Sequence, residues 1–363
     1  MKAAVCHEHG KPLTIEEVSI GDPVGRQVKV KIGACAICHS DIHYAEGAWG
    51  GYTPAIYGHE AAGVVVDVGP DVGRIAIGDR VLVTLIRSCG SCHFCEQGEP
   101  VMCGQSAAND ETHHLKLEDG TEIAQGMKTA AFAEWVLVDD SQVAKLPEDI
   151  CLDSACLLSC GVITGVGAVI NTAKVNPGSN VVVIGVGGVG LNAVQGAKIA
   201  GAKTIIAVDI EDQKLEIARR FGATHGVNAG VEKLPREIRT LTDGYGADYV
   251  FVTVGSQQAI DSSYRLMRRG GQVVIVGMPS VTEKSEFLPL ALTASNQRIQ
   301  GSFMGQTRLR VDIPWLLSLY KQGILKLDEL ISNRYTLDEI NLAIEDTCKG
   351  KSLRNILIID DLL

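Results

Sequence analysis

The sequence predicts an α/β protein of two domains, one rich in β-strands and one built on a parallel β-sheet. Its 363 residues are enough for about two domains, at roughly 150 residues each. Up to about residue 160 the hydrophobic segments are short and separated by turns, whereas residues 162–303 alternate short apolar runs with stretches of helical length. A glycine-rich turn also joins a strand to a helix in this second part. Residues 304–363 are too few for a third domain, so we expect them to fold back onto the first part.

Three segments predict strands in the first part. Residues 28–32 alternate apolar and polar side chains, residues 62–66 end close to Gly69-Pro70, and residues 80–83 follow Gly78-Asp79. Glycine, proline and aspartate at these boundaries are typical of turns, so this part is predicted to be mainly β-structure.

The second part repeats a strand followed by a helix. Strands are predicted at residues 180–184, 204–208, 248–253 and 272–276. Helical spacing of apolar residues predicts helices at residues 189–200, 212–221 and 257–268, and another in the C-terminal part at residues 313–322. This repetition is typical of a doubly wound parallel sheet.

Composition and charge exclude several classes of protein. The formal net charge is −10, which repels the phosphates of nucleic acids, so no nucleic-acid partner is expected. No apolar run approaches the ~20 residues of a membrane-spanning helix, and the N-terminus becomes charged at once instead of forming an apolar signal region. We therefore expect a cytoplasmic protein without a membrane partner. The eleven cysteines then indicate thiolate chemistry or metal binding rather than disulfides.

The glycine-rich turn has the G-x-G-x-x-G pattern of a dinucleotide site. Gly185, Gly187 and Gly190 follow the predicted strand at residues 180–184 and open a helix, where backbone N–H groups can receive a pyrophosphate. Asp209 stands nineteen residues past Gly190, where a carboxylate can accept both hydroxyls of an adenosine ribose. This carboxylate would repel a ribose phosphate, and no arginine follows at residues 210–212, so NAD is expected rather than NADP. The alternative is a tight turn with a helix-capping aspartate.

One compact set of cysteines predicts a metal site. Cys89, Cys92, Cys95 and Cys103 offer four thiolates within fifteen residues, which suits a closed, tetrahedral, structural zinc site. An iron–sulfur cluster or unligated buried thiols are the alternatives for this set.

A second set of possible ligands is dispersed along the chain. Cys38, His59 and Cys160 are the ligand types of a catalytic zinc with one open position, although spacing alone does not establish that they meet. Cys35 and Cys38, followed by His39, also match the pattern of haem attachment. That attachment requires export, and a redox dithiol would be expected in a βαβ unit, so Cys35 is interpreted as a small buried residue.

These motifs together resemble the zinc-dependent medium-chain alcohol dehydrogenases, over essentially the whole chain. The similarity is greatest to the NAD-linked alcohol and glutathione-dependent formaldehyde dehydrogenases that bind two zinc ions. It implies a GroES-like catalytic domain of residues 1–161 and 304–363, with a Rossmann NAD-binding domain of residues 162–303 between its two parts. The segments that carry the resemblance are Cys38-His39-Ser40-Asp41-Ile42-His43, Gly58-His59-Glu60, the four-cysteine segment, Leu158-Ser159-Cys160-Gly161, the glycine-rich turn and Gly350-Lys351-Ser352-Leu353-Arg354.

The resemblance assigns a role to each residue of the zinc motifs. It implies a catalytic zinc on Cys38, His59 and Cys160, with Glu60 as an alternative ligand and Asp41 orienting His59. The four-cysteine segment would hold a structural zinc. Ser40 would take the alcohol proton and His43 would release it to solvent, whereas Ser40 and Asp41 could alternatively only cap a helix.

The resemblance also implies contacts with cofactor and substrate. His39 and Arg354 would contact the pyrophosphate, or could be solvated surface charges; Thr164 and Val189 would contact the nicotinamide, or could be packing residues. His113 and His114 are expected to be loop residues. The substrate cleft would be lined by Leu85, Phe132 and Met278. The full set of cofactor residues comprises His39, Thr164, Gly185, Gly187, Gly188, Val189, Gly190, Asp209, Ile210, Lys214, Thr253, Val254, Val276, Gly277 and Arg354.

The expected reaction is hydride transfer between a primary or moderately bulky alcohol and NAD, which gives an aldehyde or ketone. The alternatives are a dehydrogenase of formaldehyde–thiol adducts of the S-hydroxymethylglutathione type and a non-catalytic protein that binds zinc and dinucleotide. Residues 46–51 do not reproduce the acidic and basic residues expected to hold glutathione, which argues against the first alternative. The small-molecule alcohol or aldehyde is the expected partner, and the family's oligomers imply a homodimer or homotetramer formed through the Rossmann sheet.

Overall fold

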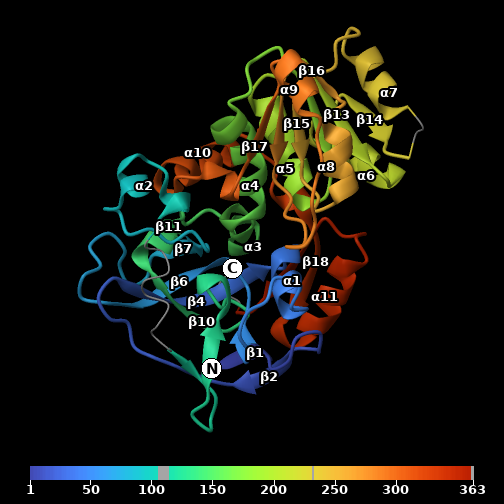
Figure 1. Ribbon diagram of the computed structural model, residues 1–363. Coiled ribbons are helices and arrows are strands. Elements are labelled where there is room, and N and C mark those ends of the chain that lie inside the picture. The colour runs from blue at the N-terminus through green and yellow to red at the C-terminus, as the bar shows by residue number, and fades with distance from the viewer. Residues whose placement is uncertain (105–113, 231–232, 361–363) are drawn as a thin grey trace. The chain divides into compact units, whose positions relative to one another are not determined.

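The computed structural model describes residues 1–104, 114–230 and 233–360 (Figure 1). The chain divides into two compact units. Unit 1 consists of Met1–Gly161, Arg308–Tyr320 and Leu327–Leu363, and unit 2 consists of Val162–Thr307 and Lys321–Lys326.

Unit 1 contains two β-sheets around a large hydrophobic core. The seven-stranded sheet has the order β11 (Val143–Lys145), β7 (Arg80–Val83), β6 (Glu60–Val68), β4 (Gln27–Ala36), β19 (Arg354–Ile358) and β18 (Ile331–Thr336), and β10 (Trp135–Asp139) also pairs with β4. The six-stranded sheet has the order β2 (Thr14–Glu17), β1 (Lys2–Cys6), β5 (Ala55–Ile56), β9 (Glu122–Gln125), β8 (Leu115–Lys116) and β3 (Ser19–Ile20).

The C-terminal part of the chain contributes to the seven-stranded sheet. β19 pairs antiparallel with β4, with Ile356 opposite Ala36 and Ile358 opposite Ala34. Its other neighbour is β18, with which it runs parallel. A strand from the end of the chain is therefore inserted beside a strand from its beginning.

Short helices connect the strands. The α-helices outside the parallel sheet are α1 (His39–Ala45), α2 (His93–Glu96), α3 (Leu152–Ala155), α4 (Gly161–Gly167), α10 (Leu309–Lys321) and α11 (Ile340–Cys348). Short 3₁₀ segments lie at Pro100–Met102, Gly126–Lys128, Asp140–Gln142, Cys156–Ser159, Met304–Gln306, Asp328–Leu330 and Leu337–Glu339, and a π-helical segment lies at Ala168–Ala173.

Unit 2 is built on a six-stranded sheet in which every pair of neighbouring strands is parallel. The order 3-2-1-4-5-6 is that of a doubly wound dinucleotide-binding sheet, so the predicted fold class is confirmed. The strands in this order are β14 (His225–Asn228), β13 (Thr204–Asp209), β12 (Asn180–Ile184), β15 (Ala247–Val252), β16 (Met267–Ile275) and β17 (Arg298–Gly301). The helices are α5 (Gly188–Ile199), α6 (Asp212–Phe221), α7 (Leu234–Leu241), α8 (Gln257–Ser263) and α9 (Pro289–Ala294).

Two helix boundaries differ from the sequence prediction by more than one residue. The helix predicted at residues 257–268 ends at Ser263, because Leu266 already accepts a hydrogen bond from the Ala247 N–H and Met267 begins β16. The helix predicted at residues 313–322 begins at Leu309, because the Asp312 carboxylate accepts the Arg308 N–H at 2.8 Å and stabilises an earlier first turn. The spacing of apolar residues does not predict either of these hydrogen bonds.

Within the described residues, no single helix has the length and apolar character needed to cross a membrane. One bent pair of helical segments, Leu152–Ser159 and Gly161–Ala173, meets that test of length and composition only when the two are taken together.

Candidate functional site

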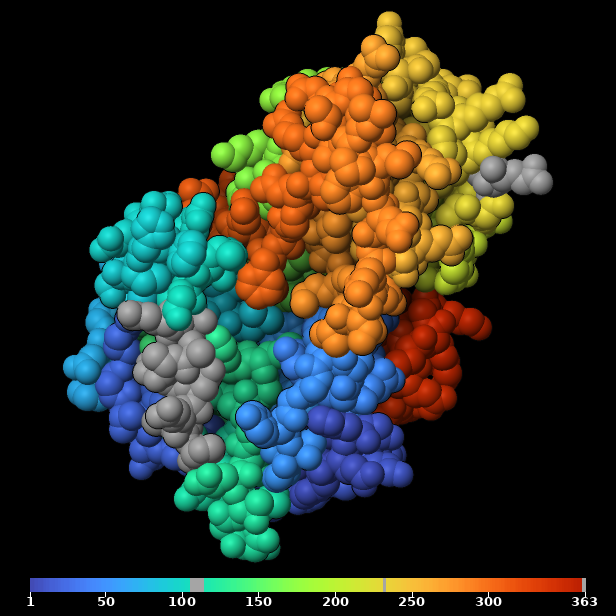
Figure 2. All heavy atoms as spheres, in the orientation of Figure 1, coloured from blue at the N-terminus to red at the C-terminus, as the bar shows by residue number. Residues whose placement is uncertain are grey.

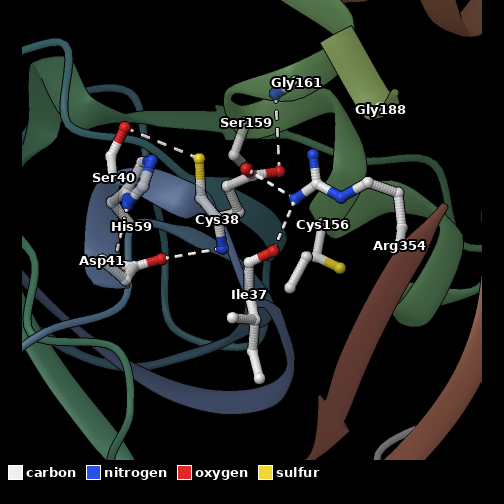
Figure 3. A network of polar contacts seen from close by, with 12 residues as sticks. Ile37, Cys38, Ser40, Asp41, His59, Cys156, Ser159, Gly161, Gly188 and Arg354 are labelled. Atoms are coloured by element: carbon white, nitrogen blue, oxygen red, sulfur yellow. Dashed lines mark hydrogen bonds and ion pairs between the residues drawn. The ribbon is translucent and has the colours of Figure 1, made fainter. Parts of the chain in front are cut away.

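Asp41 organises the first turn of α1 and the histidine beside it (Figure 3). The Asp41 side chain is 1% exposed, and its Oδ2 accepts the backbone N–H of Cys38 at 3.0 Å. Its Oδ1 accepts the Gly58 N–H at 2.9 Å and lies 3.0 Å from Nδ1 of His59. One buried carboxylate therefore caps the helix and fixes the imidazole ring. Asp41 performs both of the roles that the sequence left as alternatives.

Four possible metal ligands converge next to this carboxylate. One ligand atom from each of Cys38, His59, Glu60 and Cys160 lies within 4.8 Å of the others. All except Cys38 are buried, and Cys38 is half-buried. Among the described residues, buried Nε2 of His59 has no hydrogen-bond partner, which is costly unless a ligand satisfies it. Two thiols and this free ring nitrogen fit a zinc ion with a position open to substrate.

Backbone geometry fixes how His59 enters the cluster. Gly58 has φ +94, and a Cβ at this position would lie 2.6 Å from the backbone N of Phe132. The buried Thr129 hydroxyl donates to the Gly58 carbonyl at 2.7 Å. Only glycine fits here, so the chain turns sharply before β6 and directs the next residue, His59, into the cluster.

The two cysteines of the cluster affect each other's ionisation. The hydrogen bond from Cys160, together with His59, holds the pKa of the Cys38 thiol well below 9.0 against the effect of burial. The same hydrogen bond and burial raise the pKa of the Cys160 thiol. Burial lowers the pKa of His59, but Asp41 and Cys38 outweigh it and raise this pKa. Cys38 is therefore the thiol that ionises first, and as a thiolate it is ready to bind a metal.

Glu60 forms a buried ion pair with Arg354. Its Oε1 lies 2.7 Å from Nη2 of Arg354, and this guanidinium also donates to the Ile37 carbonyl at 3.3 Å (Figure 3). Burial raises the pKa of Glu60 to about 7, although the Arg354 charge lowers it. Arg354 is 6% exposed, so it is not a solvated surface charge. The sequence pointed to both residues but gave no sign that they form a pair.

Ser40 and His43 lie one helical turn apart on α1. Cys38 is the N-cap and Ser40 is the second residue of the helix, so Ser40 is not the capping residue. The Cys38 Sγ donates to the Ser40 Oγ at 3.7 Å. Residues three apart share one face of a helix, which places the half-buried His43 on the side of Ser40.

The four-cysteine segment forms a second cluster at the surface of unit 1 (Figure 2, cyan). The sulfurs of Cys89 and Cys95 lie 4.0 Å apart and those of Cys92 and Cys103 lie 3.8 Å apart. All four ligand atoms lie within 4.8 Å of one another. Backbone N–H groups, first that of Ser91, lower the pKa of Cys89 to about 6. This compact set of four sulfurs fits a tetrahedral structural zinc.

The glycine-rich turn of unit 2 connects β12 to α5. Gly185 has φ +82, and a Cβ at Gly190 would lie 1.9 Å from the Gly185 carbonyl oxygen. A Cβ at Gly187 would meet nothing within 4 Å. At the end of β13, Asp209 accepts the N–H of Val186 at 2.9 Å and that of Glu211 at 3.1 Å. The carboxylate thus stabilises the turn, and its remaining lone pairs can accept hydroxyls.

Other predicted cofactor residues lie at the same edge of this parallel sheet. Thr253 and Val254 follow β15, and Val276 and Gly277 follow β16. A Cβ at Gly277 would lie 2.4 Å from the Val254 carbonyl carbon, so these two chain turns are in close contact. The remaining predicted residues of unit 2 have varied surroundings. Ile210 is 75% exposed, the Lys214 ammonium lies 2.8 Å from the Glu211 carboxylate, and Thr164 is buried. Gly188 and Val189 are the first two residues of α5, and His39 in unit 1 is the first residue of α1.

The three predicted substrate-lining residues have different environments. Leu85 is half-buried, Phe132 is fully buried against Gly58, and Met278 is 53% exposed. His113 lies outside the described residues, whereas Nε2 of His114 lies 2.8 Å from the Gln27 side-chain nitrogen. Sequence reasoning did not select Trp49, whose ring contacts His43; an aromatic residue within a glycine-rich loop was the available signal.

Comparisons with known proteins agree with this geometry. Residues 24–148 match the alcohol dehydrogenase GroES-like domain, and residues 188–322 match the zinc-binding dehydrogenase family. The S-(hydroxymethyl)glutathione dehydrogenase of Paracoccus denitrificans is 37% identical over 372 residues, which cover 98% of this chain and 99% of the relative. The class-3 alcohol dehydrogenase of Pisum sativum is 38% identical, with 99% and 98% covered.

Solved structures are similar over the whole chain as well. A zinc-binding domain protein of the alcohol dehydrogenase type from Burkholderia ambifaria has a TM-score of 0.95 and 34% identity, with 99% of this chain and 98% of the other covered. Benzyl alcohol dehydrogenase from Acinetobacter calcoaceticus has a TM-score of 0.93 and 31% identity, with 99% of each chain covered. Together with the two cysteine-containing clusters and the dinucleotide turn, these similarities show that the chain belongs to the zinc-dependent medium-chain alcohol dehydrogenases, which use zinc and NAD.

Proposed function

We propose that this protein oxidises a primary or moderately bulky alcohol with NAD, or reduces the corresponding aldehyde or ketone. The convergence of Cys38, Cys160 and the unpartnered Nε2 of His59 carries this proposal. When they are bound, zinc lowers the pKa of an alcohol hydroxyl as a Lewis acid and NAD accepts the hydride. The chain's own residues must hold both groups and remove one proton.

We assign Cys38, His59 and Cys160 as ligands of the catalytic zinc. Because Asp41 accepts a hydrogen bond from Nδ1, one His59 proton is held on that nitrogen, and a metal ion would displace any proton from Nε2 and bind its lone pair. Arg354 pairs with Glu60 and thereby keeps this carboxylate neutralised beside the cluster. Glu60 is then an electrostatic partner of the site and an alternative ligand.

The second zinc is assigned to Cys89, Cys92, Cys95 and Cys103. Four protein ligands leave no position for substrate, so this ion has a structural role. It would cross-link residues 89–103, where α2 and the following 3₁₀ turn each contain few residues and bury little apolar surface.

Proton removal is assigned to Ser40 and His43. The Ser40 Oγ lies beside the Cys38 sulfur and can accept a proton from a hydroxyl held at the cluster. The His43 ring lies one turn further along α1 and is half-exposed, so it can pass the proton to water. The two residues would make a path from the buried cluster to solvent.

NAD binding is assigned to unit 2, which would be the cofactor domain, with unit 1 the catalytic domain. Gly185, Gly187 and Gly190 allow the backbone to approach the pyrophosphate, and Asp209 accepts the ribose hydroxyls. The residues at the ends of β15 and β16 would complete the surface that holds the cofactor. We also assign His39 and Arg354 to the phosphates of the cofactor.

The second candidate substrate is the adduct of formaldehyde with glutathione or another thiol. The names of the curated relatives favour it, since both S-(hydroxymethyl)glutathione dehydrogenase and class-3 alcohol dehydrogenases are among them. Against it, Glu46 is the only charged residue in the segment 46–51. We therefore rank a simple alcohol first.

We further propose a cytoplasmic homodimer or homotetramer. β17 is an edge strand of the sheet in unit 2. Next to it in sequence, the N-cap residue of α9, Leu288, is 75% exposed and Leu290 within α9 is 80% exposed. An open edge and exposed leucines are suited to pairing with a second copy. Cysteines that bind zinc must stay reduced, which suits a reducing compartment.

A panel of alcohols and aldehydes, followed by NADH absorbance, tests this function. Formaldehyde should be assayed with and without glutathione in the same series. Turnover of simple alcohols without thiol is the expected result. Strict dependence on a thiol would replace the first candidate with the second.

A further inference from the structure

The ring of His43 packs against Trp49, a residue without an assigned role in the proposed reaction. The two ring centroids lie 4.9 Å apart and the planes are inclined by 40°. Among the residues that the structure describes, His43 makes this ring contact and no side-chain hydrogen bond. Rotation of an imidazole about its terminal torsion is weakly restricted, so its orientation depends on the surfaces that it touches.

A tightly turned loop carries Trp49 back to α1. Ala48 donates its N–H to the His43 carbonyl at 2.8 Å, and Gly47 donates to the Tyr44 carbonyl at 3.0 Å. A third hydrogen bond joins the Gly50 N–H to the Gly47 carbonyl at 3.0 Å. Gly47 and Gly50 have φ +78 and +73, which glycine adopts without strain. The position of Trp49 is therefore built into the backbone of this loop.

Two tyrosines support Trp49 from the side of the core. The Tyr44 ring meets Trp49 at 5.4 Å with an interplanar angle of 86°, and it stacks on Tyr57 at 6.2 Å and 21°. Tyr57 is 3% exposed, and its hydroxyl donates to the Tyr44 carbonyl at 3.3 Å. Edge-on and offset contacts of this kind are favourable geometries for aromatic pairs. The indole is thus held between His43 and the half-buried Tyr44, which itself stacks on the buried Tyr57.

We propose that Trp49 is a positioning residue that holds the His43 ring in the orientation from which it releases the proton to solvent. The inference rests on the proposed path from Ser40 to His43. Trp49 acts through His43 and needs no contact with substrate or cofactor for this role.

Three substitutions separate the effect of the aromatic contact with His43 from the effect of side-chain size at position 49. Trp49→Phe keeps an aromatic partner, Trp49→Leu removes it, and Trp135→Leu is a matched control on β10 in the same unit. With Trp49→Leu, kcat for alcohol oxidation should fall roughly three- to tenfold at low buffer concentration and recover when imidazole buffer is added. Trp49→Phe should stay close to wild type, Trp135→Leu should not change kcat, and KM for NAD should change little in all three.

Tryptophan emission of the zinc-loaded enzyme tests the contact without turnover. Since a protonated imidazole quenches a nearby indole, wild type and Trp135→Leu should show an acid-induced loss of emission that His43→Gln and Trp49→Leu lack. Persistence of this loss in Trp49→Leu would overturn the contact. Wild-type kcat and buffer dependence in Trp49→Leu would overturn the positioning role. The proposed proton path would fail if His43→Gln kept full turnover without added imidazole, and the proposed function would fail if the wild type oxidised no alcohol. In either case the role of Trp49 would fail as well. The tryptophan emission would still report whether the two rings are in contact.

Discussion

Asp41 and His59 form the buried pair on which the proposed catalytic site depends: Oδ1 of the carboxylate lies 3.0 Å from Nδ1 of the ring, and neither side chain is more than 1% exposed. The pair connects the start of α1 with the start of β6. Because Nδ1 is occupied, the other ring nitrogen is left facing the cysteines. The geometry of the ligand set is thereby fixed before any metal binds.

Asp41→Asn should weaken zinc binding at this site. An amide cannot supply the charge that supports the His59 ring, and loss of such a partner typically costs about 10- to 100-fold in metal affinity. Competition with a chromophoric chelator measures the affinity of the protein for the zinc ion at this site. Asp119→Asn, at an exposed loop carboxylate in unit 1, is the control and should leave that affinity unchanged. Equal affinities in Asp41→Asn and wild type would contradict the role given to this pair.

Asp209→Gly should narrow the preference for NAD over NADP. The substitution removes the acceptor of the ribose hydroxyls and the charge that repels a ribose phosphate. A hydrogen bond to a charged group contributes about 1.5–3 kcal/mol, so the ratio of the two kcat/KM values should fall roughly 10-fold or more. Both absolute values should also fall, since Asp209 stabilises the glycine-rich turn through Val186.

Glu211→Gln serves as the control for that experiment, because Glu211 is a neighbouring acid that pairs with Lys214. It should leave the cofactor ratio close to that of wild type. An unchanged ratio in Asp209→Gly would remove the aspartate from the ribose site.

Cys95→Ser should reduce stability before it affects chemistry. One of four sulfurs is lost, so the structural zinc is released and residues 89–103 lose their cross-link. We expect the Tm to fall by about 5 °C or more, while kcat at low temperature stays near that of wild type. Differential scanning calorimetry measures the loss of stability, and a rate assay at about 10 °C measures turnover separately. Cys348→Ser, at an exposed cysteine, should change neither, and a Tm equal to wild type in Cys95→Ser would exclude a structural role for this cluster.

Tyr57→Phe should reduce the decrease in the free energy of unfolding at alkaline pH. Burial, followed by the neighbouring Cys6, raises the pKa of Tyr57 from 10.0 to about 12. The folded protein therefore keeps this proton when the unfolded chain has lost it, and the free energy of unfolding decreases as the pH rises from 10 to 12. Phenylalanine lacks the titrating group, so the decrease over this window should be smaller by up to roughly 2 kcal/mol.

Urea unfolding at successive pH values measures this effect. Tyr52→Phe is the matched control because Tyr52 is 86% exposed, and it should follow the wild-type slope. The same slope in Tyr57→Phe and wild type would show that Tyr57 does not retain its proton in the folded state.

The sequence predicted the parallel sheet well because each buried strand is a short apolar run between turns. The strand at Asn180–Ile184 and the helix at Asp212–Phe221 have the predicted bounds. The C-terminus of α8 was wrong, since Leu266 and Met267 have apolar spacing that suits both a helix and a strand entrance. The hydrogen bond that decides between them comes from Ala247, about twenty residues away.

The candidate site divides in the same way. Local patterns carry the four-cysteine cluster and the glycine-rich turn, since the residues of each lie close together in sequence. Cys38 and Cys160 are distant in sequence, and the resemblance to a family was needed to group them. The pairing of Glu60 with Arg354 and the packing of Trp49 on His43 depend on tertiary contacts that no spacing encodes.

Zinc content, measured with the fold intact, tests the central claim most directly. Elemental analysis of chelator-washed protein should give two zinc ions per chain for wild type and one for Cys38→Ser, with an unchanged circular dichroism spectrum and unchanged NAD affinity in the variant. Turnover should be lost in Cys38→Ser. Active wild-type protein with zinc only at the four-cysteine cluster, or a Cys38→Ser variant that keeps both ions and full activity, would contradict the account.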